Sequence, residues 1–446
     1  MRRSAHLFII LLSVAICYSN SWQGTFQFDD HNVIVANPVV HSWSAWRADL
    51  AQGIRPLLKL TYTWNWVSGY GLLGFHLVNI LFHAANSLLL FCLAGTLFPT
   101  LSTASRLVSV LLFAVHPLQT EAVTYICGRS VSQMALFYLG SLLLFFLGRA
   151  RGNGWMQFFL SPLLFLMAVL TKEVAFTLPL ALVLCQVAQG ERGGIWRWFA
   201  GQWVHWGLLF VLCFLLLAHR GYGHLLEACF DVRGIVVNVL TQINGILYLL
   251  SRIAMPQALS IDPDLPLVTT ITGPGVAGGI ALMALLVAGC QGLARGQVAG
   301  FGILWFLLHL LPTNSLIPRL DVANDRQLYL ASWGLFLACA VWGERVQGRV
   351  VRGGLMVAVC LALFVLAGLT LARNRVYRSE IALWEDTATQ SPGKARVHNN
   401  LGYAYELAHR RGDAEKAYLR ALALDPGSEL ARANLSRLRE GRRGGE

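Results

Sequence analysis

The chain has 446 residues, of which 56% are hydrophobic and only 13% are charged, and its formal net charge is +12. A soluble domain carries about 25% charged residues, so this composition excludes an ordinary soluble protein and predicts an all-α, polytopic transmembrane helical bundle. The basic excess does not indicate nucleic-acid binding, because Lys and Arg lie in short loops between apolar runs, where they set membrane orientation.

The first apolar run covers residues 7–22 and follows the basic pair Arg2-Arg3. It lacks a clean small-x-small cleavage site, so we expect an uncleaved first span rather than a signal peptide. A long loop, residues 24–74, follows this span and carries Asp29 and Asp30 near its start. Adjacent carboxylates repel each other, and a surface loop has no structural need for such a pair. The pair is therefore a candidate for general-base catalysis or for binding a divalent cation through oxygen.

Further apolar stretches predict ten more spans, which makes eleven in all. The stretch at residues 235–254 is more polar than the others, and we expect it to be re-entrant or to lie on the membrane surface. If it crossed the membrane, later arginines would face outward, against the positive-inside bias; these are Arg295, Arg345, Arg349 and Arg352. The ten later spans are predicted at residues 75–98, 107–115, 131–147, 155–170, 174–189, 204–218, 276–293, 301–311, 328–342 and 355–372.

The predicted second span carries polar residues at positions i, i+3, i+7 and i+10, namely His76, Asn79, His83 and Asn86. This spacing places all four on one helix face. Polar groups inside membrane spans commonly hold helices together by hydrogen bonds, which is the plainer interpretation of this face.

The end of the chain is a polar module, residues 373–446, that we separate from the membrane part, residues 1–372. It contains 14 Lys and Arg and 10 Asp and Glu, which is 24 of the 58 charged residues (35 + 23). The module can cap the last span or bind a protein partner, and the sequence does not decide between these roles. A tetratricopeptide pattern at the correct offsets is formed by Leu401, Gly402, Tyr405, Ala414, Tyr418, Ala421 and Pro426, with a last helix expected near Glu429.

The predicted topology places the charges that break the apolar pattern on one side, in outer loops or at outer span ends. Ionisable groups at membrane depth are costly and often mark a site, although single loop charges can simply be solvated. Arginine and lysine suit phosphate, so the basic members are candidate phosphate ligands. The full set is Asp29, Asp30, Arg55, His116, Glu121, Arg129, Lys172, Glu173, Arg319, Asp321, Asp325 and Arg326.

A series of short motifs, each occurring once, extends along almost the whole chain. They are Phe28-Asp29-Asp30, Arg55-Pro56-Leu57, Phe75-His76-Leu77-Val78-Asn79, His116-Pro117 with Glu121-Ala122-Val123, Lys172-Glu173, the stretch 314–329 and the C-terminal repeat. In this order they resemble the GT-C class of membrane glycosyltransferases, and more closely the transmembrane and tetratricopeptide-repeat-containing O-mannosyltransferase-like family of bacterial type. This chain departs from that family in having about one repeat and in carrying Asp325 where relatives often have Glu.

The resemblance implies inverting transfer of one sugar, mannose in the family, from a polyprenyl-phosphate carrier to an acceptor hydroxyl on a protein Ser or Thr or on a glycan. It implies that Asp29 or Asp30 is the general base and that cations at the span mouths hold the carrier phosphate. If the reaction uses a divalent cation, Mg²⁺ or Mn²⁺, the same two aspartates are its expected ligands. The expected location is a bacterial inner membrane, with the site and the C-terminal module on the extracytoplasmic face.

Two other functions compete with this one. A transporter or lipid flippase predicts paired charges at the bilayer midplane and internal repeats, and the sequence has neither. A membrane-anchored tetratricopeptide scaffold leaves the outer acidic loop without a role. No Walker loop or metalloprotease motif is present, which argues against an ATP-driven pump.

Overall fold

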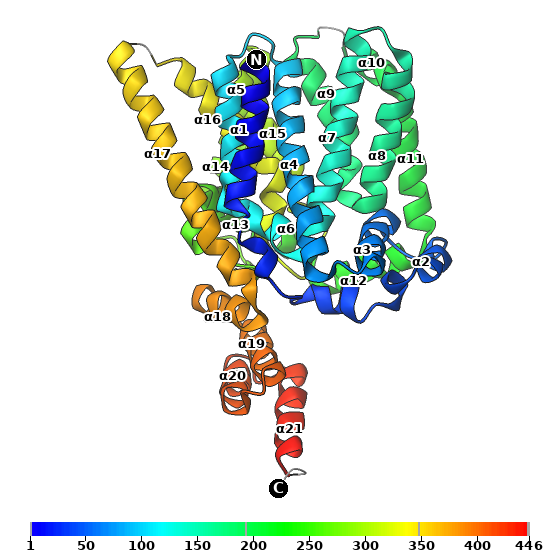
Figure 1. Cartoon of the computed structure of the whole chain (residues 1–446), viewed down its shortest axis with the longest axis vertical. Coiled ribbons are helices and arrows are strands. Elements are labelled where there is room, and N and C mark those ends of the chain that lie inside the picture. The colour runs from blue at the N-terminus through cyan, green and yellow to red at the C-terminus, as the bar shows by residue number, and fades with distance from the viewer. Residues whose placement is uncertain (1, 192–193, 347, 444–446) are drawn as a thin grey trace.

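The computed structural model describes residues 2–191, 194–346 and 348–443, and these form helices and loops without a strand. Long helices stand side by side in one bundle, and four shorter helices follow beneath it at the C-terminus (Figure 1). The all-α prediction is therefore confirmed. Met1 of the predicted N-terminal start and residues 444–446 of the predicted module lie outside the described residues. The bundle helices are α1 (Arg2–Cys17), α4 (Gly71–Leu97), α5 (Thr103–Val115), α7 (Arg129–Ala150), α8 (Ser161–Thr171), α9 (Leu178–Ala188), α11 (Trp203–Ala218), α14 (Gly273–Ala294), α15 (Val298–Leu310), α16 (Leu328–Glu344) and α17 (Arg349–Asn374).

Six of the described helices are long and apolar enough to cross a membrane, or seven if one bent pair counts as a single span. These helices support a multi-pass membrane protein. Several of the other predicted spans form helices of 11 to 17 residues, such as α9 and α16, whereas a straight span needs about 20 residues. The number of eleven spans stays a prediction.

The polar face of α4 binds neighbouring segments through hydrogen bonds between side chains and carbonyls. Asn79 donates to the carbonyl of Val123 at 3.2 Å, and Asn86 donates to the carbonyl of Ser132 at 2.8 Å. His83 bonds the carbonyl of Ala114 at 3.1 Å. This face joins α4 to α7 and to the end of α5, as expected for polar groups that hold spans together.

Helix α13 (Ile235–Ala254) is the more polar stretch. Whether it crosses the membrane decides on which side the later loops lie. It is one unbroken helix and is long enough to cross a membrane by composition. Near its start, the Asn238 amide donates to the carbonyl of Ser315 at 2.8 Å, and near its end the carbonyl of Ile253 bonds the His116 ring at 3.1 Å. Both contacts are made with loops at the same end of the bundle. The expectation that this segment is re-entrant or lies on the membrane surface stays a prediction.

The first long loop forms helices α2 (Trp43–Asp49) and α3 (Pro56–Ser68), which lie under the bundle beside α12 (Arg220–Val232) (Figure 1). Short helix α6 (Thr120–Val123) lies at the same level, between α5 and α7. The lower end of the bundle is therefore covered by loop-borne helices, and the predicted outer residues lie there.

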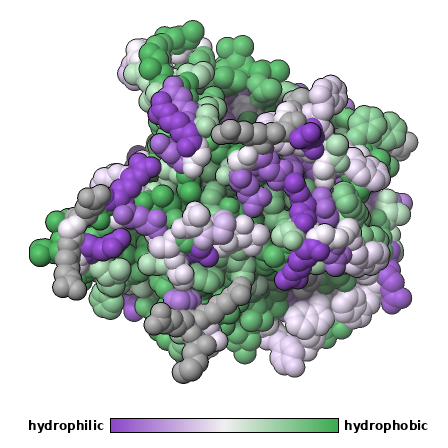
Figure 2. Space-filling view, turned by 90° about the horizontal axis from the view of Figure 1, so that it is seen from above, coloured by the Kyte–Doolittle hydropathy of each residue, from purple (hydrophilic) through white to green (hydrophobic). Residues whose placement is uncertain are grey.

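The opposite end of the bundle carries α10 (Gly194–Gly201) and short loops (Figure 1). Seen from above, hydrophilic residues gather over the helix ends, with hydrophobic residues around and between them (Figure 2). Basic residues of these loops include Arg106, Arg151 and Arg295. An end with many basic residues is typical of the cytoplasmic side of a membrane protein.

The C-terminal helices are α18 (Glu380–Gln390), α19 (Ala395–Leu407), α20 (Arg411–Leu424) and α21 (Glu429–Arg443). Helix α21 begins at Glu429, where the repeat period places it. A Cβ at Gly402 would lie 2.6 Å from the Tyr418 ring, so the close packing of α19 on α20 requires glycine there. These four helices match the expected arrangement of the module, and its assignment as a tetratricopeptide repeat remains a prediction.

Candidate active site

The two adjacent aspartates have different surroundings. Asp30 is fully buried, and its two carboxylate oxygens accept the backbone N–H groups of Gln27 at 3.0 Å and Cys127 at 2.8 Å. Burial raises the pKa of Asp30 to about 7, although these hydrogen bonds act in the opposite direction. Asp30 therefore holds the loop against the segment that leads into α7, and its burial keeps the carboxylate away from a substrate.

Asp29 faces outward, and its side chain is 41% exposed. The backbone N–H of Asp29 donates to the hydroxyl of Tyr125 at 3.0 Å, which fixes the orientation of the backbone at Asp29. The nearest cation is Arg326, whose Nη1 lies 4.0 Å from Asp29 Oδ2. Burial raises the pKa of Asp29, and Arg326 offsets part of this effect. Asp29 is thus the accessible carboxylate of the pair.

Arg326 joins Asp29 to a second carboxylate, Glu121 of α6. The backbone N–H of Arg326 donates to Glu121 Oε2 at 2.9 Å, and its Nε lies 3.5 Å from Glu121 Oε1. Glu121 is only 2% exposed, so this ion pair is shielded from water. Burial and the nearby charge of Glu121 raise the pKa of Asp325, which lies beside Arg326 in the chain. The pair positions the Arg326 guanidinium between α6 and Asp29.

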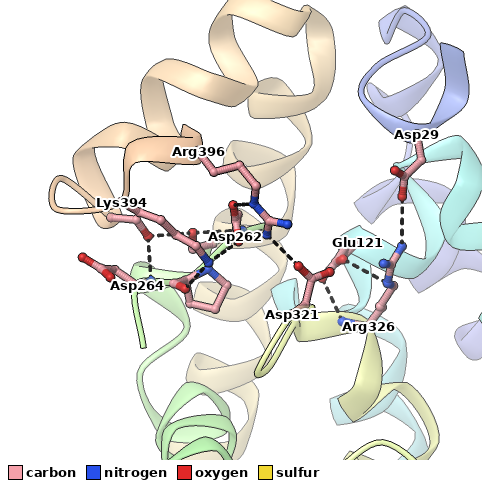
Figure 3. Close-up of polar contacts among 11 residues, drawn as sticks. Asp29, Glu121, Asp262, Asp264, Asp321, Arg326, Lys394 and Arg396 are labelled. Atoms are coloured by element: carbon pink, nitrogen blue, oxygen red, sulfur yellow. Dashed lines mark hydrogen bonds and ion pairs between the residues drawn. The ribbon is translucent and has the colours of Figure 1, made fainter. Parts of the chain in front are cut away.

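A line of alternating charges leads from this pair to the C-terminal module (Figure 3). Arg396 of α19 donates to Asp321 at 2.6 Å and to Asp262 Oδ2 at 2.8 Å. Lys394 donates to Asp262 Oδ1 at 2.5 Å. Asp321 therefore serves as an anchor for the module next to the Glu121–Arg326 pair, rather than as an open ligand.

A cleft beside Arg326 brings three cations together. Its volume is about 40 Å³. Its wall combines the basic residues Lys172, Arg319 and Arg326 with apolar side chains such as Met134 and Leu330. Like charges repel at close range, so this grouping favours an anion. The cleft, lined by Val131, Met134, Tyr138, Lys172, Val174, Thr177, His309, Thr313, Arg319, Asn324, Arg326, Gln327 and Leu330, is here called the cationic cleft.

Lys172 lies at the end of α8, where the helix gives way to an extended residue. Its Nζ donates to Ser130 Oγ at 3.2 Å. Burial lowers the pKa of Lys172 well below its usual value, and the charges of Arg326, Arg55 and Arg319 lower it further. An anion in the cationic cleft would remove this repulsion.

Arg55 and Glu173 form an ion pair with each other, and Arg55 Nε donates to Glu173 Oε2 at 3.0 Å. Arg55 adopts a left-handed backbone conformation, with φ of 54°. Both side chains of the pair are about one-third exposed, and Glu173 directly follows Lys172 in the chain. It ties the first outer loop to the segment between α8 and α9.

Two predicted site residues have structural partners instead. Arg129 is fully buried and donates from Nη2 to the carbonyl of Phe75 at 2.8 Å and from Nε to Asn79 Oδ1 at 2.7 Å. The His116 ring bonds the carbonyl of Ile253 and accepts the N–H of Leu118 at 3.2 Å. Neither side chain has a free polar atom that faces the cationic cleft, so we leave both out of the proposed site.

The two aspartates do not fit a shared cation site. Both oxygens of Asp30 accept backbone N–H groups, so Asp29 is the only one of the pair that offers a free carboxylate. A bound divalent cation needs several oxygen ligands. Within residues 2–191, 194–346 and 348–443, no group of three or more His, Cys, Asp or Glu side chains is placed to hold a metal ion.

The sequence reasoning missed four residues that contact this region. Tyr125 and Glu380 hold the loop that carries Asp29, and Asn324 and Gln327 line the cationic cleft. Asn324 and Gln327 lie within the motif stretch 314–329, so their closeness to Arg326 in the sequence could have identified them as candidates. Glu380 gave no local signal, because its partners are far away in the sequence.

Comparison with known proteins supports the resemblance carried by the motifs. A protein O-mannosyl-transferase of Caenorhabditis elegans is 25% identical over 94% of this chain. Protein O-mannosyl-transferase TMTC3 of Mus musculus is 26% identical over 96% of it. The chain is similar to protein O-mannosyl-transferases along almost its whole length. TMTC4 of the same species is 26% identical over 87% of the chain.

These relatives are longer than this chain. The aligned part covers 63% of the C. elegans protein, 52% of mouse TMTC3 and 62% of mouse TMTC4. No family model matches the chain, and no solved structure matches it.

Proposed function

We propose that this protein is a membrane glycosyltransferase of the GT-C type that transfers one sugar from a polyprenyl-phosphate carrier to an acceptor hydroxyl. Mannose is the sugar expected from the names of the relatives. The acceptor is a protein Ser or Thr or a hydroxyl of a glycan. The observation that carries the proposal is the exposed carboxylate of Asp29 beside the cationic cleft, with Arg326 shared between them.

The proposed reaction begins with the acceptor hydroxyl at Asp29. The carboxylate takes the hydroxyl proton while the acceptor oxygen forms a bond to the anomeric carbon of the sugar. The bond between that carbon and the phosphate oxygen breaks, and polyprenyl phosphate leaves with the electron pair. Attack from the side opposite the phosphate inverts the anomeric configuration. The raised pKa of Asp29 favours this role, because it strengthens the carboxylate as a base.

The cationic cleft suits the leaving group. Lys172, Arg319 and Arg326 offer positive charge to a phosphate whose negative charge increases as the bond breaks. The apolar part of the wall, including Met134 and Leu330, suits the first isoprene units of the carrier. An activated sugar phosphate of this kind needs no nucleotide, which agrees with the absence of a Walker loop from the sequence.

The proposed orientation places the site and the C-terminal module on the extracytoplasmic face, and a bacterial inner membrane is the proposed location. Basic loops at the other end of the bundle support this orientation through the positive-inside rule. We further propose that residues 1–372 form the transferase domain. In this proposal residues 373–446 form a tetratricopeptide module that can bind a protein partner.

Purified full-length protein incubated with polyprenyl-phosphate mannose and an acceptor peptide tests the proposal. Asp29→Asn should lower the transfer rate by about 100-fold or more, since a general base contributes factors of about 10²–10⁴. Asp264→Asn is the matched control, because Asp264 is also an exposed outer-loop aspartate but lies at the module contact. Full activity of Asp29→Asn, with the control also active, would contradict the assignment of the base.

A further inference from the structure

Five buried polar atoms in the wall of the cationic cleft have no hydrogen-bond partner in the described part of the chain. They are Oδ1 and Nδ2 of Asn324, Oε1 and Nε2 of Gln327, and Nε2 of His309. All three side chains line the same cleft as Lys172, Arg319 and Arg326. The three side chains thus border one space, next to the proposed phosphate ligands.

Unpaired buried polar atoms need an explanation, because most such atoms in native proteins are hydrogen-bonded. Others occur elsewhere among the described residues, for example Tyr62 Oη and Trp333 Nε1, but these side chains do not line the cationic cleft. Only a group of atoms that faces an accessible space can be satisfied by a ligand. The side chains of Asn324, Gln327 and His309 all line the cationic cleft.

The mixture of donors and acceptors restricts the ligand. Each amide offers a carbonyl oxygen that accepts and an NH₂ that donates. The His309 ring bonds the carbonyl of Trp305 through Nδ1 at 2.8 Å, so Nδ1 carries the proton and the neutral ring leaves Nε2 as an acceptor. The side chains that line the cleft therefore offer three unpaired acceptors and two unpaired NH₂ donors.

A phosphate cannot satisfy this set, because its ionised oxygens only accept, and an isoprene chain offers neither donors nor acceptors. A sugar hydroxyl both donates and accepts. Several hydroxyl groups on one ring can pair with both ends of an amide and with an imidazole nitrogen. The chemistry of these three side chains thus favours a polyhydroxylated ring over the other parts of the carrier.

The position of the group along the chain also fits. Asn324 and Gln327 lie on either side of Asp325 and Arg326, and Arg326 Nη1 lies 4.0 Å from Asp29. A sugar held by these amides would lie beside Arg326, which borders both the cationic cleft and the proposed base.

We propose that Asn324, Gln327 and His309 form the pocket that recognises the donor sugar, by hydrogen bonds from its hydroxyl groups to the five unpaired atoms. This inference rests on the proposed function, since it assigns the sugar subsite of the same site. It adds that selectivity among sugars is set here, because a site built to bond a hydroxyl rejects an analogue without it.

The test uses Asn324→Leu and Gln327→Leu in the full-length protein, each replacing an unpaired amide by an apolar side chain of similar size. Binding of polyprenyl-phosphate mannose should weaken by about tenfold or more. Binding of sugar-free polyprenyl phosphate should not change. The thermal unfolding midpoint should stay the same or rise, because removing an unpaired buried polar group costs no native hydrogen bond.

Gln133→Leu is the matched control. The Gln133 amide is buried but paired, accepting from Thr61 Oγ1 and donating to the carbonyl of Leu57, both at 2.9 Å. Its loss should lower the unfolding midpoint without changing the preference for the sugar-bearing lipid. A lower midpoint for Asn324→Leu and Gln327→Leu, with unchanged sugar preference, would overturn the inference.

The two proposals fail in different ways. Wild-type protein that binds sugar-free polyprenyl phosphate as tightly as polyprenyl-phosphate mannose overturns the sugar pocket, while carrier recognition stands. Wild-type protein that binds neither lipid overturns the proposed function and the pocket with it. Mannose analogues that lack one hydroxyl give a second measurement. An analogue that weakens wild-type binding but not binding to Gln327→Leu supports a hydrogen bond between that hydroxyl and Gln327.

Discussion

Glu380 accepts the backbone N–H of Phe28, at 3.1 Å from Oε1 and 3.2 Å from Oε2, across 352 positions of sequence. Phe28 directly precedes Asp29 and has a positive φ of 47°, a conformation that a bulky residue seldom adopts without support. Glu380 also bonds the His31 ring at 3.0 Å and accepts Trp384 Nε1–H at 3.0 Å. The first helix of the C-terminal module therefore holds the loop that carries the proposed base.

Glu380→Gln should lower kcat about tenfold and leave KM for the lipid donor near its wild-type value. The expected cause is a displaced Asp29, since small errors in the position of a reacting group are costly. Glu380→Asp should recover part of the rate, because it restores a carboxylate near the Phe28 N–H. Glu385→Gln is the control, since Glu385 lies on the same helix as Glu380 but accepts the hydroxyl of Tyr405 on α19 instead. Equal losses in both variants would assign Glu380 to stability alone.

The stability of the fold should depend on pH through Asp30. Its carboxyl has an ordinary pKa of 3.8, and burial raises it to about 7 in the folded chain. Between these values the folded state binds more protons than the unfolded state, so the free energy of unfolding should fall as pH rises from about 4 to about 7. Thermal unfolding across this range measures the slope. Asp30→Asn should flatten it, and an unchanged slope in that variant would contradict the assignment.

Lys172→Gln should weaken binding of the phosphate-bearing donor. The wild-type lysine lies among three arginine charges, and an anion relieves their repulsion. We expect KM for the donor to rise about tenfold, as for the loss of one charge-assisted hydrogen bond. Lys59→Gln is the control, because Lys59 pairs with Asp49 at 2.5 Å in the same outer layer. The outcome that contradicts a phosphate role is an equal KM for both variants.

Arg396→Gln should loosen the C-terminal module from the bundle. Arg396 bonds both Asp262 and Asp321, so its loss leaves two partly buried carboxylates with fewer partners. Hydrogen exchange of α18 and α19 should increase relative to the bundle helices. Arg410→Gln, which affects an exposed pair within the module, should leave that exchange unchanged. Protection equal to wild type in Arg396→Gln would show that other contacts hold the module.

The sequence predicted the elements better than their partners. Apolar runs gave the bundle helices, and the repeat period placed the start of α21 at Glu429. The separate roles of Asp29 and Asp30 depend on the N–H of Cys127, which lies 97 positions from Asp30. Arg129 has the charge expected of a phosphate ligand, yet Phe75 and Asn79 bond it within the core. No local sequence pattern encodes contacts over such distances. A charged residue at a span end therefore predicts where the site lies, but not whether that residue binds substrate or holds the fold together.

The contact between Glu380 and Phe28 also has a consequence for biosynthesis. The ribosome makes Asp29 early and Glu380 more than 300 residues later, and chains are synthesised at about 5–20 residues per second. The loop with the proposed base therefore receives its last support only after α18 has reached the same side of the membrane. If the proposed function holds, a nascent chain that already contains the bundle helices would remain a weak catalyst until Glu380 has been made and has folded against Phe28.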